Sequence, residues 1–260
     1  MFSNKEFIEV SRKFVCVRLD SYESATHQEW VRRFLNGRFE NSCFCILAPD
    51  GKDWLTRSGR GPHQVFGAEE RAIAEMTQIA AGYKPSGDLS QAVVEDFHSV
   101  RQALNVASAD QRMLVLIAGP QVKLAVSRKS LRIVASHKAV IGRYHFDFED
   151  QSDWRETVTQ GTLEHGIFMI QSGEFGMDGK VLLELSLDAE PAEILTALEK
   201  ARAAFVAATP KKVYRDHVEK GGQLGVYFEG AVPYGEDRDA DGQIDRVGRR
   251  RGPRGGRGSQ

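Results

Sequence analysis

Cysteine, long apolar runs and net charge are all scarce in this chain of 260 residues. It has three cysteines, and an odd number without framework spacing argues against a small secreted module held together by disulfides. No run of about eighteen apolar residues occurs, so the sequence predicts a soluble protein without a membrane span. The formal net charge of -1 carries no averaged signal for a charged partner, so any electrostatic binding site has to be local.

The first residues also lack the pattern of a secretory signal peptide, because Met1 to Glu6 are too polar. We therefore expect either a cytoplasmic protein or an exported protein that has been trimmed. Hydrophobic residues make up 41% of the chain and charged residues 27%, which is ordinary for a globular protein. The length is sufficient for two small domains, each with its own hydrophobic core.

The first third of the chain predicts alternating helices and strands. A helix is expected over residues 4–12, and the apolar, β-branched run from Phe14 to Leu19 predicts a strand. From about Ser24 to Asn36 the apolar spacing is helical, Thr26 to Glu29 matches a capping box, and Gly37 is a natural stop. The remaining elements are a strand at residues 43–47, an Asp-Gly-Lys hairpin turn at 50–52, a partner strand from residue 54, and a helix at 68–81.

After a linker at residues 85–91 that contains proline and glycine, the same order recurs. The expected elements are a helix at 94–107, a strand at 113–117, a helix at 122–134, strands at 144–148, 166–170 and 181–187, and a closing helix from Pro191. An Asp-Gly-Lys turn at residues 178–180 again precedes the last strand and helix. We therefore predict an α/β protein with two tandem domains, each a mixed sheet flanked by helices. The predicted segments are residues 1–84, 92–209, an extension at 210–247, and a tail at 248–260.

This order of strand, turn, long helix, strand, Asp-Gly-Lys hairpin and terminal helix resembles that of the thioredoxin-like superfamily. The resemblance covers residues 3–83 well and residues 92–207 more loosely. The family carries a Trp-Cys-x-x-Cys motif after its first core strand. At the corresponding turn, Tyr22 stands at the tryptophan position, while Glu23 and Thr26 stand at the two cysteine positions. The matching turn of the second region, Ala118 to Gln121, contains no cysteine either.

Dithiol exchange requires an attacking thiolate and a second thiol that resolves the mixed disulfide. Neither Glu23 nor Thr26 can supply these groups, whereas a carboxylate at residue 23 suits the positive N-terminus of a helix. The resemblance therefore implies a fold kept for its surface. We expect a redox-inactive binding or scaffold protein with a protein partner, without enzymatic activity or an organic cofactor.

The three cysteines, Cys16, Cys43 and Cys45, lie in apolar runs, which predicts reduced thiols packed in the core. On a strand, Cys43 and Cys45 would face the same side about 6.6 to 7 Å apart, which is poor geometry for a disulfide. The alternative hypothesis is a divergent thiol oxidoreductase that uses Cys16, Cys43 or Cys45. A soft-metal site at the same thiols is a further alternative.

The chemical motif with the most matching positions lies near the C-terminus. Residues 237–245 match the first nine positions of an EF-hand calcium loop and resemble the loops of dockerin-like repeats. The candidate Ca²⁺ ligands are Asp237, Asp239, Asp241, the backbone of Gln243, and Asp245. Position twelve, where a bidentate glutamate belongs, is Gly248, so weak calcium binding is the prediction, with an acidic turn as the alternative.

The last residues, 249–258, consist mainly of arginine and glycine, a composition that predicts disorder. Such a segment can contact RNA through its charge. Because no aromatic residues interleave with the arginines, we favour a solvated tail over an RNA-binding segment.

Overall fold

The computed structural model describes residues 4–17, 19, 25–37, 43–84, 88–90 and 92–226. These residues divide into two compact units, one within Met1–Lys84 and the other within Pro85–Val226. The chain is an α/β protein, as predicted, with a mixed five-stranded sheet flanked by helices in the second unit. Within the described residues, no helix is both long and apolar enough to cross a membrane.

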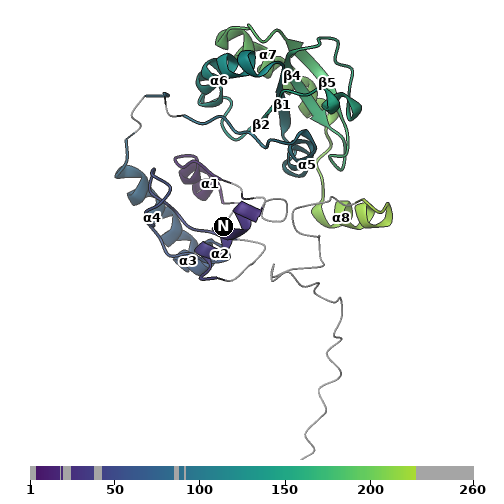
Figure 1. Cartoon of the computed structure of the whole chain (residues 1–260). Coiled ribbons are helices and arrows are strands. Elements are labelled where there is room, and N and C mark those ends of the chain that lie inside the picture. Colours follow the sequence, from purple (N-terminus) through teal and green to yellow (C-terminus); the bar gives the residue numbers. More distant parts are fainter. Residues whose placement is uncertain are drawn as a thin grey trace, which may run out of the picture. The chain divides into compact units, whose positions relative to one another are not determined.

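The described part of the first unit is built from helices. These are α1 (Lys5–Ser11), α2 (Ala25–Phe34), α3 (Pro62–Phe66) and α4 (Glu69–Ala81) (Figure 1). The side chain of Asn4 caps α1 by accepting hydrogen bonds from the backbone N–H groups of Glu6 and Phe7. Helices α1 and α4 pack together over a small apolar core. That core consists of Phe7, Val10, Ile46, Val65, Phe66, Ala72 and Met76.

The strands predicted for the first unit are not formed in its described residues. In the run from Phe14 to Leu19, the described residues are irregular, and Val15 and Val17 are 91% and 77% exposed. An apolar, β-branched run becomes a strand only when a neighbouring strand pairs with it, and no pairing is found there. Residues 43–47 form only single bridges, Phe44 with Gly59 and Leu47 with Trp54. The described residues of this unit therefore do not form the predicted mixed sheet.

The helix predicted from about Ser24 to Asn36 is present as α2, but its capping box is not as predicted. Thr26 is the second residue of the helix, so it does not occupy the N-cap position. The predicted stop is confirmed, because Gly37 adopts a φ of +84° and donates a backbone hydrogen bond of 2.7 Å to Arg32.

The second unit contains a mixed sheet with the strand order β2-β1-β4-β5-β3. Its strands are β1 (Met113–Ala118), β2 (Tyr144–Glu149), β3 (Val158–Thr159), β4 (Gly166–Ser172) and β5 (Gly179–Leu185). Strand β1 pairs parallel with β2 and antiparallel with β4, which pairs antiparallel with β5. Every residue of β1 is buried, which explains the continuous apolar run in its sequence.

Helices cover both faces of this sheet. Figure 1 shows α6 (Gln121–Ala135) and α7 (Pro191–Ala208) on one face and α5 (Val100–Asp110) on the other. Alternate side chains of β1 divide between two apolar clusters, with Val115 in the cluster under α6 and α7 and Leu116 in the cluster under α5. A 3-10 turn, η1 (Asp153–Glu156), precedes β3, and a further helix, α8 (Tyr214–Gln223), follows α7.

Two differences from prediction matter for the second unit. The helix expected at 94–107 begins later, because Ser99 caps α5 and Phe97 donates a backbone hydrogen bond of 2.9 Å to the Asp147 carboxylate on β2. Side-chain bonding to β2 thus keeps the preceding residues extended. Helix α8 was not predicted, because its sequence is polar and includes two glycines.

Candidate functional site

Of the two turns at which the sequence resembles the thioredoxin-like family, the structure describes only the second in full. Tyr22 and Glu23 lie outside the described residues, and Thr26 is exposed on α2. In the second unit, Gly119 and Pro120 connect β1 to α6. A Cβ atom added to Gly119 would lie 2.6 Å from Leu187 Cδ1 and 3.4 Å from His165 Cβ, so neighbouring side chains close this turn. It offers neither a nucleophile nor space for a larger side chain.

The predicted placement of the cysteines in the core was wrong. Cys16 is exposed, and Cys43 and Cys45 are half-buried free thiols. The reason is the alternation of side chains along an extended segment: Phe44 and Ile46 face the apolar core, so their neighbours Cys43 and Cys45 face away from it. A hydrogen bond between the two thiols, with burial, raises the pKa of Cys43, and the same bond lowers the pKa of Cys45.

The predicted calcium ligands Asp237, Asp239, Asp241, Gln243 and Asp245 lie outside the described residues, as does the arginine-glycine tail. Within the described part of the chain, no group of three or more histidine, cysteine, aspartate or glutamate side chains could hold a metal ion.

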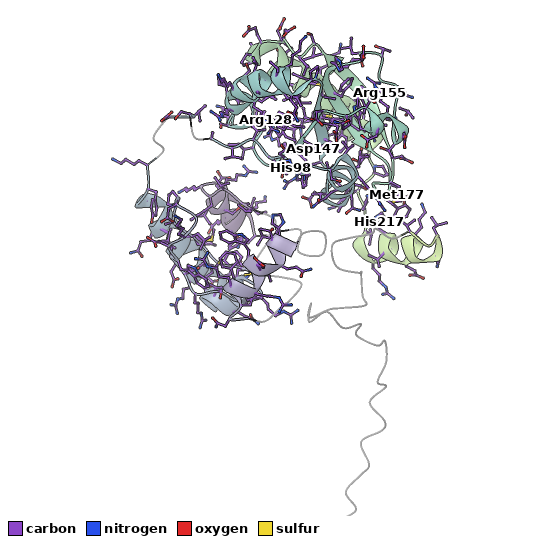
Figure 2. All side chains as sticks on the ribbon, viewed as in Figure 1. His98, Arg128, Asp147, Arg155, Met177 and His217 are labelled. Carbon is purple, nitrogen blue, oxygen red and sulfur yellow. The ribbon has the colours of Figure 1, made fainter. Side chains whose placement is uncertain are left out.

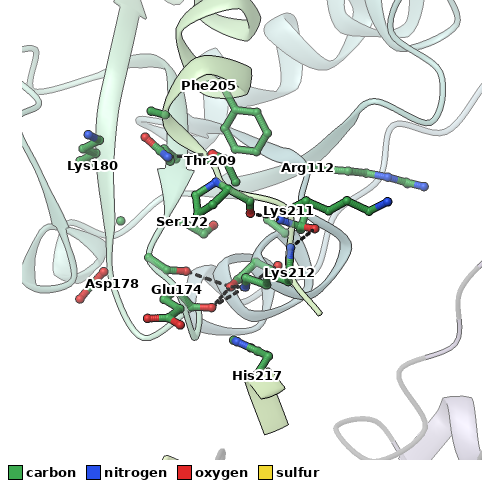
Figure 3. A pocket seen from close by; sticks show the side chains of 18 of the residues that line it. Arg112, Ser172, Glu174, Asp178, Lys180, Phe205, Thr209, Lys211, Lys212 and His217 are labelled. Carbon is green, nitrogen blue, oxygen red and sulfur yellow. Dashed lines mark hydrogen bonds between the residues drawn. The ribbon is translucent and has the colours of Figure 1, made fainter. Parts of the chain in front are cut away.

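The candidate site that the structure reveals is a cleft in the second unit (Figure 3). Its volume is about 900 Å³, which is large enough for a peptide segment or a small molecule. It lies where α5 and α7 end, β4 ends, β5 begins, and α8 follows. Because β4 runs antiparallel to β1, this is the end of the sheet opposite to the turn at Gly119.

One wall of the cleft is the segment between α7 and α8, and a set of hydrogen bonds fixes it to α5. The Gln111 side chain donates to the Pro210 carbonyl at 2.7 Å and accepts from the Lys212 backbone at 3.0 Å. Lys212 Nζ donates to the Ser108 carbonyl at 2.9 Å, to Ser108 Oγ at 2.8 Å, and to the Glu174 carbonyl. Burial lowers the pKa of Lys212. This lysine is therefore engaged in the structure of the cleft wall.

Helix α8 is held against the turn between β4 and β5. Lys220 Nζ forms an ion pair with the Glu174 carboxylate at 2.6 Å, and the hydrogen bond from Lys220 lowers the pKa of Glu174. The rings of His217 and Phe175 stack with their centroids 4.6 Å apart. Burial lowers the pKa of His217, which favours the neutral imidazole in this stack. The position of α8 thus depends on one exposed ion pair and one ring contact.

Three cationic side chains of the cleft have no partner among the described residues and can therefore bind a ligand. Arg112, Lys180 and Lys211 line it, and within the described residues their side chains form no ion pair or hydrogen bond. In Figure 3, Arg112 and Lys211 extend on one side of the cleft and Lys180 lies on the other. The acidic lining residues are Glu174, Asp178 and Asp216, so the lysine and arginine residues outnumber the carboxylates by five to three. The arrangement favours an anionic ligand that extends across the cleft.

Sequence reasoning missed this site because its cations come from separate segments. Arg112 precedes β1, Lys180 lies on β5, and Lys211 follows α7. No local spacing pattern connects such residues. The sequence after Thr209 is polar, but this composition alone does not indicate that the segment forms one wall of a cleft.

A second polar cluster surrounds His145 on β2 and is partly open to solvent, because the Glu95 and Asp110 side chains are 42% and 27% exposed. His145 is 3% exposed; its Nδ1 lies 2.9 Å from Glu95 Oε2 and its Nε2 lies 3.1 Å from Asp110 Oδ2. Although burial opposes the charged form, these two carboxylates raise the pKa of His145. Asp147 is fully buried on the same strand (Figure 2). Because the two carboxylates already bond to both ring nitrogens of His145, the cluster joins the segment before α5 to the sheet.

Comparisons of this chain with protein-family models, with curated proteins and with solved structures give no match.

Proposed function

We propose that this chain is a redox-inactive, thioredoxin-like binding protein whose partner is another protein. The second unit supports the fold assignment through its order of β1, turn, α6, β2, the β4–β5 hairpin with Asp178 to Lys180, and α7. This is the order on which the resemblance rests. For Met1–Lys84 the same assignment stays a prediction, since its described residues form no strand beyond single bridges.

The observation that carries the binding function is the cleft with its three unpaired cations. A cation that lies half exposed without a partner attracts an anion without first breaking an internal ion pair. Arg112 and Lys180 lie on opposite sides of the cleft in Figure 3, an arrangement that suits an extended ligand with several negative charges better than one small anion. An extended segment rich in aspartate and glutamate provides these charges, and its backbone can also contact the apolar lining at Phe205 and Pro210.

Binding of a fluorescein-labelled hexaglutamate peptide, measured by fluorescence anisotropy, tests this proposal. We expect the affinity to fall as salt rises, because exposed charges are screened beyond about 10 Å at 0.1 M ionic strength. Lys211→Ala and Lys180→Ala should each weaken binding by about tenfold, equivalent to about 1.4 kcal/mol. The matched control is Lys129→Ala on the exposed side of α6, which should leave binding unchanged. Absence of binding, or equal loss in the control, contradicts the proposal.

We further propose that residues 237–245 bind Ca²⁺ weakly through Asp237, Asp239, Asp241, the Gln243 backbone and Asp245. The support is the spacing of these oxygen ligands and Gly242 at the sharp turn. Calorimetric titration of the full chain with calcium, alongside Asp239→Ala, tests it. Heat in the millimolar range that disappears in the variant is expected; no heat at millimolar calcium leaves the segment as an acidic turn.

A divergent thiol oxidoreductase is the second candidate function. It is favoured by the exposure of Cys16 and by the placement of Cys43 and Cys45, both half-buried, on the same side of an extended segment. Under this hypothesis the protein accelerates reduction of insulin disulfides by dithiothreitol, and replacing the attacking cysteine by serine abolishes the acceleration. A rate equal to that of dithiothreitol alone would remove this candidate and leave the binding function.

A further inference from the structure

Helix α6 carries apolar side chains on the side that faces away from the core. Val122, Val126 and Ile133 each expose more than half of their surface. Because each residue of an α-helix turns the chain by about 100°, these three side chains lie within about 40° of one another around the helix axis, with Lys129 beside them. The fully buried Leu131 projects from the opposite side, into the apolar cluster under α6 and α7. The outermost line of α6 is therefore apolar although the core does not use it.

The spacing of this line is that of a coiled-coil seam. Residues 122, 126, 129 and 133 are separated by four, three and four positions, which is the alternation of d and a positions in a heptad repeat. Val126 and Ile133 then stand at a positions, where β-branched side chains favour pairing with one further helix. The seam is narrower than the apolar face of a helix that lies in a membrane interface, and it has no tryptophan, phenylalanine or leucine. The geometry therefore favours a single helix over a lipid surface as the occupant.

The charge around this line indicates the sign of the partner. From residue 121 to residue 146 the sequence contains several lysines and arginines but no aspartate or glutamate. Two of the cations on α6 are already engaged, because Arg128 pairs with Asp96 and Arg132 donates a hydrogen bond of 2.6 Å to the carbonyl of residue 90. Lys123 and Lys129 are exposed, and within the described residues their side chains form no hydrogen bond or ion pair. These two lysines can therefore bind carboxylates without breaking an existing contact.

A second copy of α6 does not suit this surface. Since α6 has no carboxylate of its own, two copies would bring only positive charges together, and like charges beside a seam oppose pairing. We propose that Val122, Val126, Lys129 and Ile133, here called the α6 seam, bind an amphipathic helix of another protein. That helix carries leucine at its a and d positions and glutamate at the flanking e and g positions. The leucines pack against the seam, and the glutamates pair with Lys123 and Lys129.

The test measures binding of the full chain to a fluorescein-labelled peptide of three heptads with leucine at a and d and glutamate at e and g. Repulsion between glutamates keeps the peptide from pairing with itself. By fluorescence anisotropy, Val126→Ser and Ile133→Ser should each weaken binding about tenfold, because each removes apolar area that the peptide buries. Lys129→Glu should weaken it at least as much and should allow binding of a peptide with lysine at e and g. The matched control is Val218→Ser on α8, where the valine is also more than half exposed, and it should leave binding unchanged.

A second measurement needs no variant, since the glutamate peptide should slow amide hydrogen exchange in α6 of the unaltered chain and leave α5 unchanged. Absence of binding, or no slowing in α6, overturns the proposal. It is also overturned if the chain forms a dimer that Val126→Ser dissociates, which indicates a second copy, or if it binds phosphatidylserine vesicles through the seam but not the peptide. No residue of α6 lines the cleft, so Lys211→Ala should leave peptide binding unchanged, and a failed hexaglutamate experiment does not decide this result.

Discussion

Replacing Asp147 by asparagine should stabilise the second unit at neutral and alkaline pH. Asp147 Oδ1 accepts a hydrogen bond of 2.9 Å from Phe97 N–H, while Oδ2 is buried and has no hydrogen-bond partner among the described residues. Burial, followed by the neighbouring Asp96 carboxylate, raises the pKa of Asp147 to about 8. Asp96 itself is paired with Arg128, which, against the opposing effect of burial, holds the pKa of Asp96 below its usual value. The folded protein therefore retains one proton between these carboxyl groups at pH 7.

The free-energy cost of retaining that proton is found by comparing the folded protein with the unfolded chain. In the unfolded chain an aspartate has its ordinary pKa of 3.8. Protonating such a group at pH 7 costs about 4 kcal/mol, at 1.36 kcal/mol for each pH unit. Since the folded-state pKa is raised, the contribution of Asp147 to the stability of the unit is fully present below pH 3.8 and declines until the pH passes about 8. Asparagine needs no proton, accepts the same bond from Phe97, and can donate to Asp96. We expect a gain of about 2 kcal/mol at pH 7, which is less than the full cost because burying the asparagine amide has a desolvation cost of its own.

Hydrogen exchange of the β1 amides, measured by mass spectrometry, reports the opening of the second unit alone. Asp147→Asn should slow this exchange by about 30-fold at pH 7 after correction for intrinsic rates, and by much less near pH 4. A gain of that size corresponds to about 4 to 8 °C in Tm. The control is Asp150→Asn just beyond β2, where the carboxyl is exposed. An equal gain at pH 4 and pH 7, or none at either, refutes the reasoning about the retained proton.

Three further predictions concern the second unit. A Cβ on Gly176, which has a φ of +70°, would lie 2.5 Å from the backbone of α5, so Gly176→Ala should cost more than about 2 kcal/mol in urea unfolding. Gly142 has a φ of +71° but open space around it, so Gly142→Ala should cost only about 1 kcal/mol, and equal losses contradict the packing argument. Leu131→Ala should lower the free energy of unfolding by about 2 to 5 kcal/mol, because Leu131 is fully buried. Its control is Ile133→Ala, at a side chain that is 52% exposed, which should change that free energy by about 0.5 kcal/mol or less. Lys212→Met should speed amide exchange in the segment between α7 and α8 without altering β1, and unchanged exchange there would show that the lysine does not hold the cleft wall.

Much of the second unit followed from local patterns. The continuous apolar run at residues 113–117, the helical spacing at 122–134 and the proline at the start of the closing helix each predicted the element that formed. In these places the local preference and the buried position of the element agree, because β1 is an inner strand of the sheet, paired on both sides, and the helices cover it.

Local patterns failed where a partner was required. Val15 and Val17 have the composition of a strand but remain exposed, because no other segment pairs with them. The apolar spacing before α5 is helical, yet Glu95 and Phe97 bond to β2 instead, and these bonds hold the chain extended. In both cases the deciding contacts come from residues far away in the sequence.

The sequence by itself determined the α/β class, the buried inner strand and the absence of a Cys-x-x-Cys motif, because these are properties of neighbouring residues. Only the tertiary structure decided that Cys43 and Cys45 lie half-buried on the side away from the core, and that Arg112, Lys180 and Lys211 line one cleft. Contacts between side chains depend on how distant segments pack, and packing is set by the whole core rather than by any short pattern.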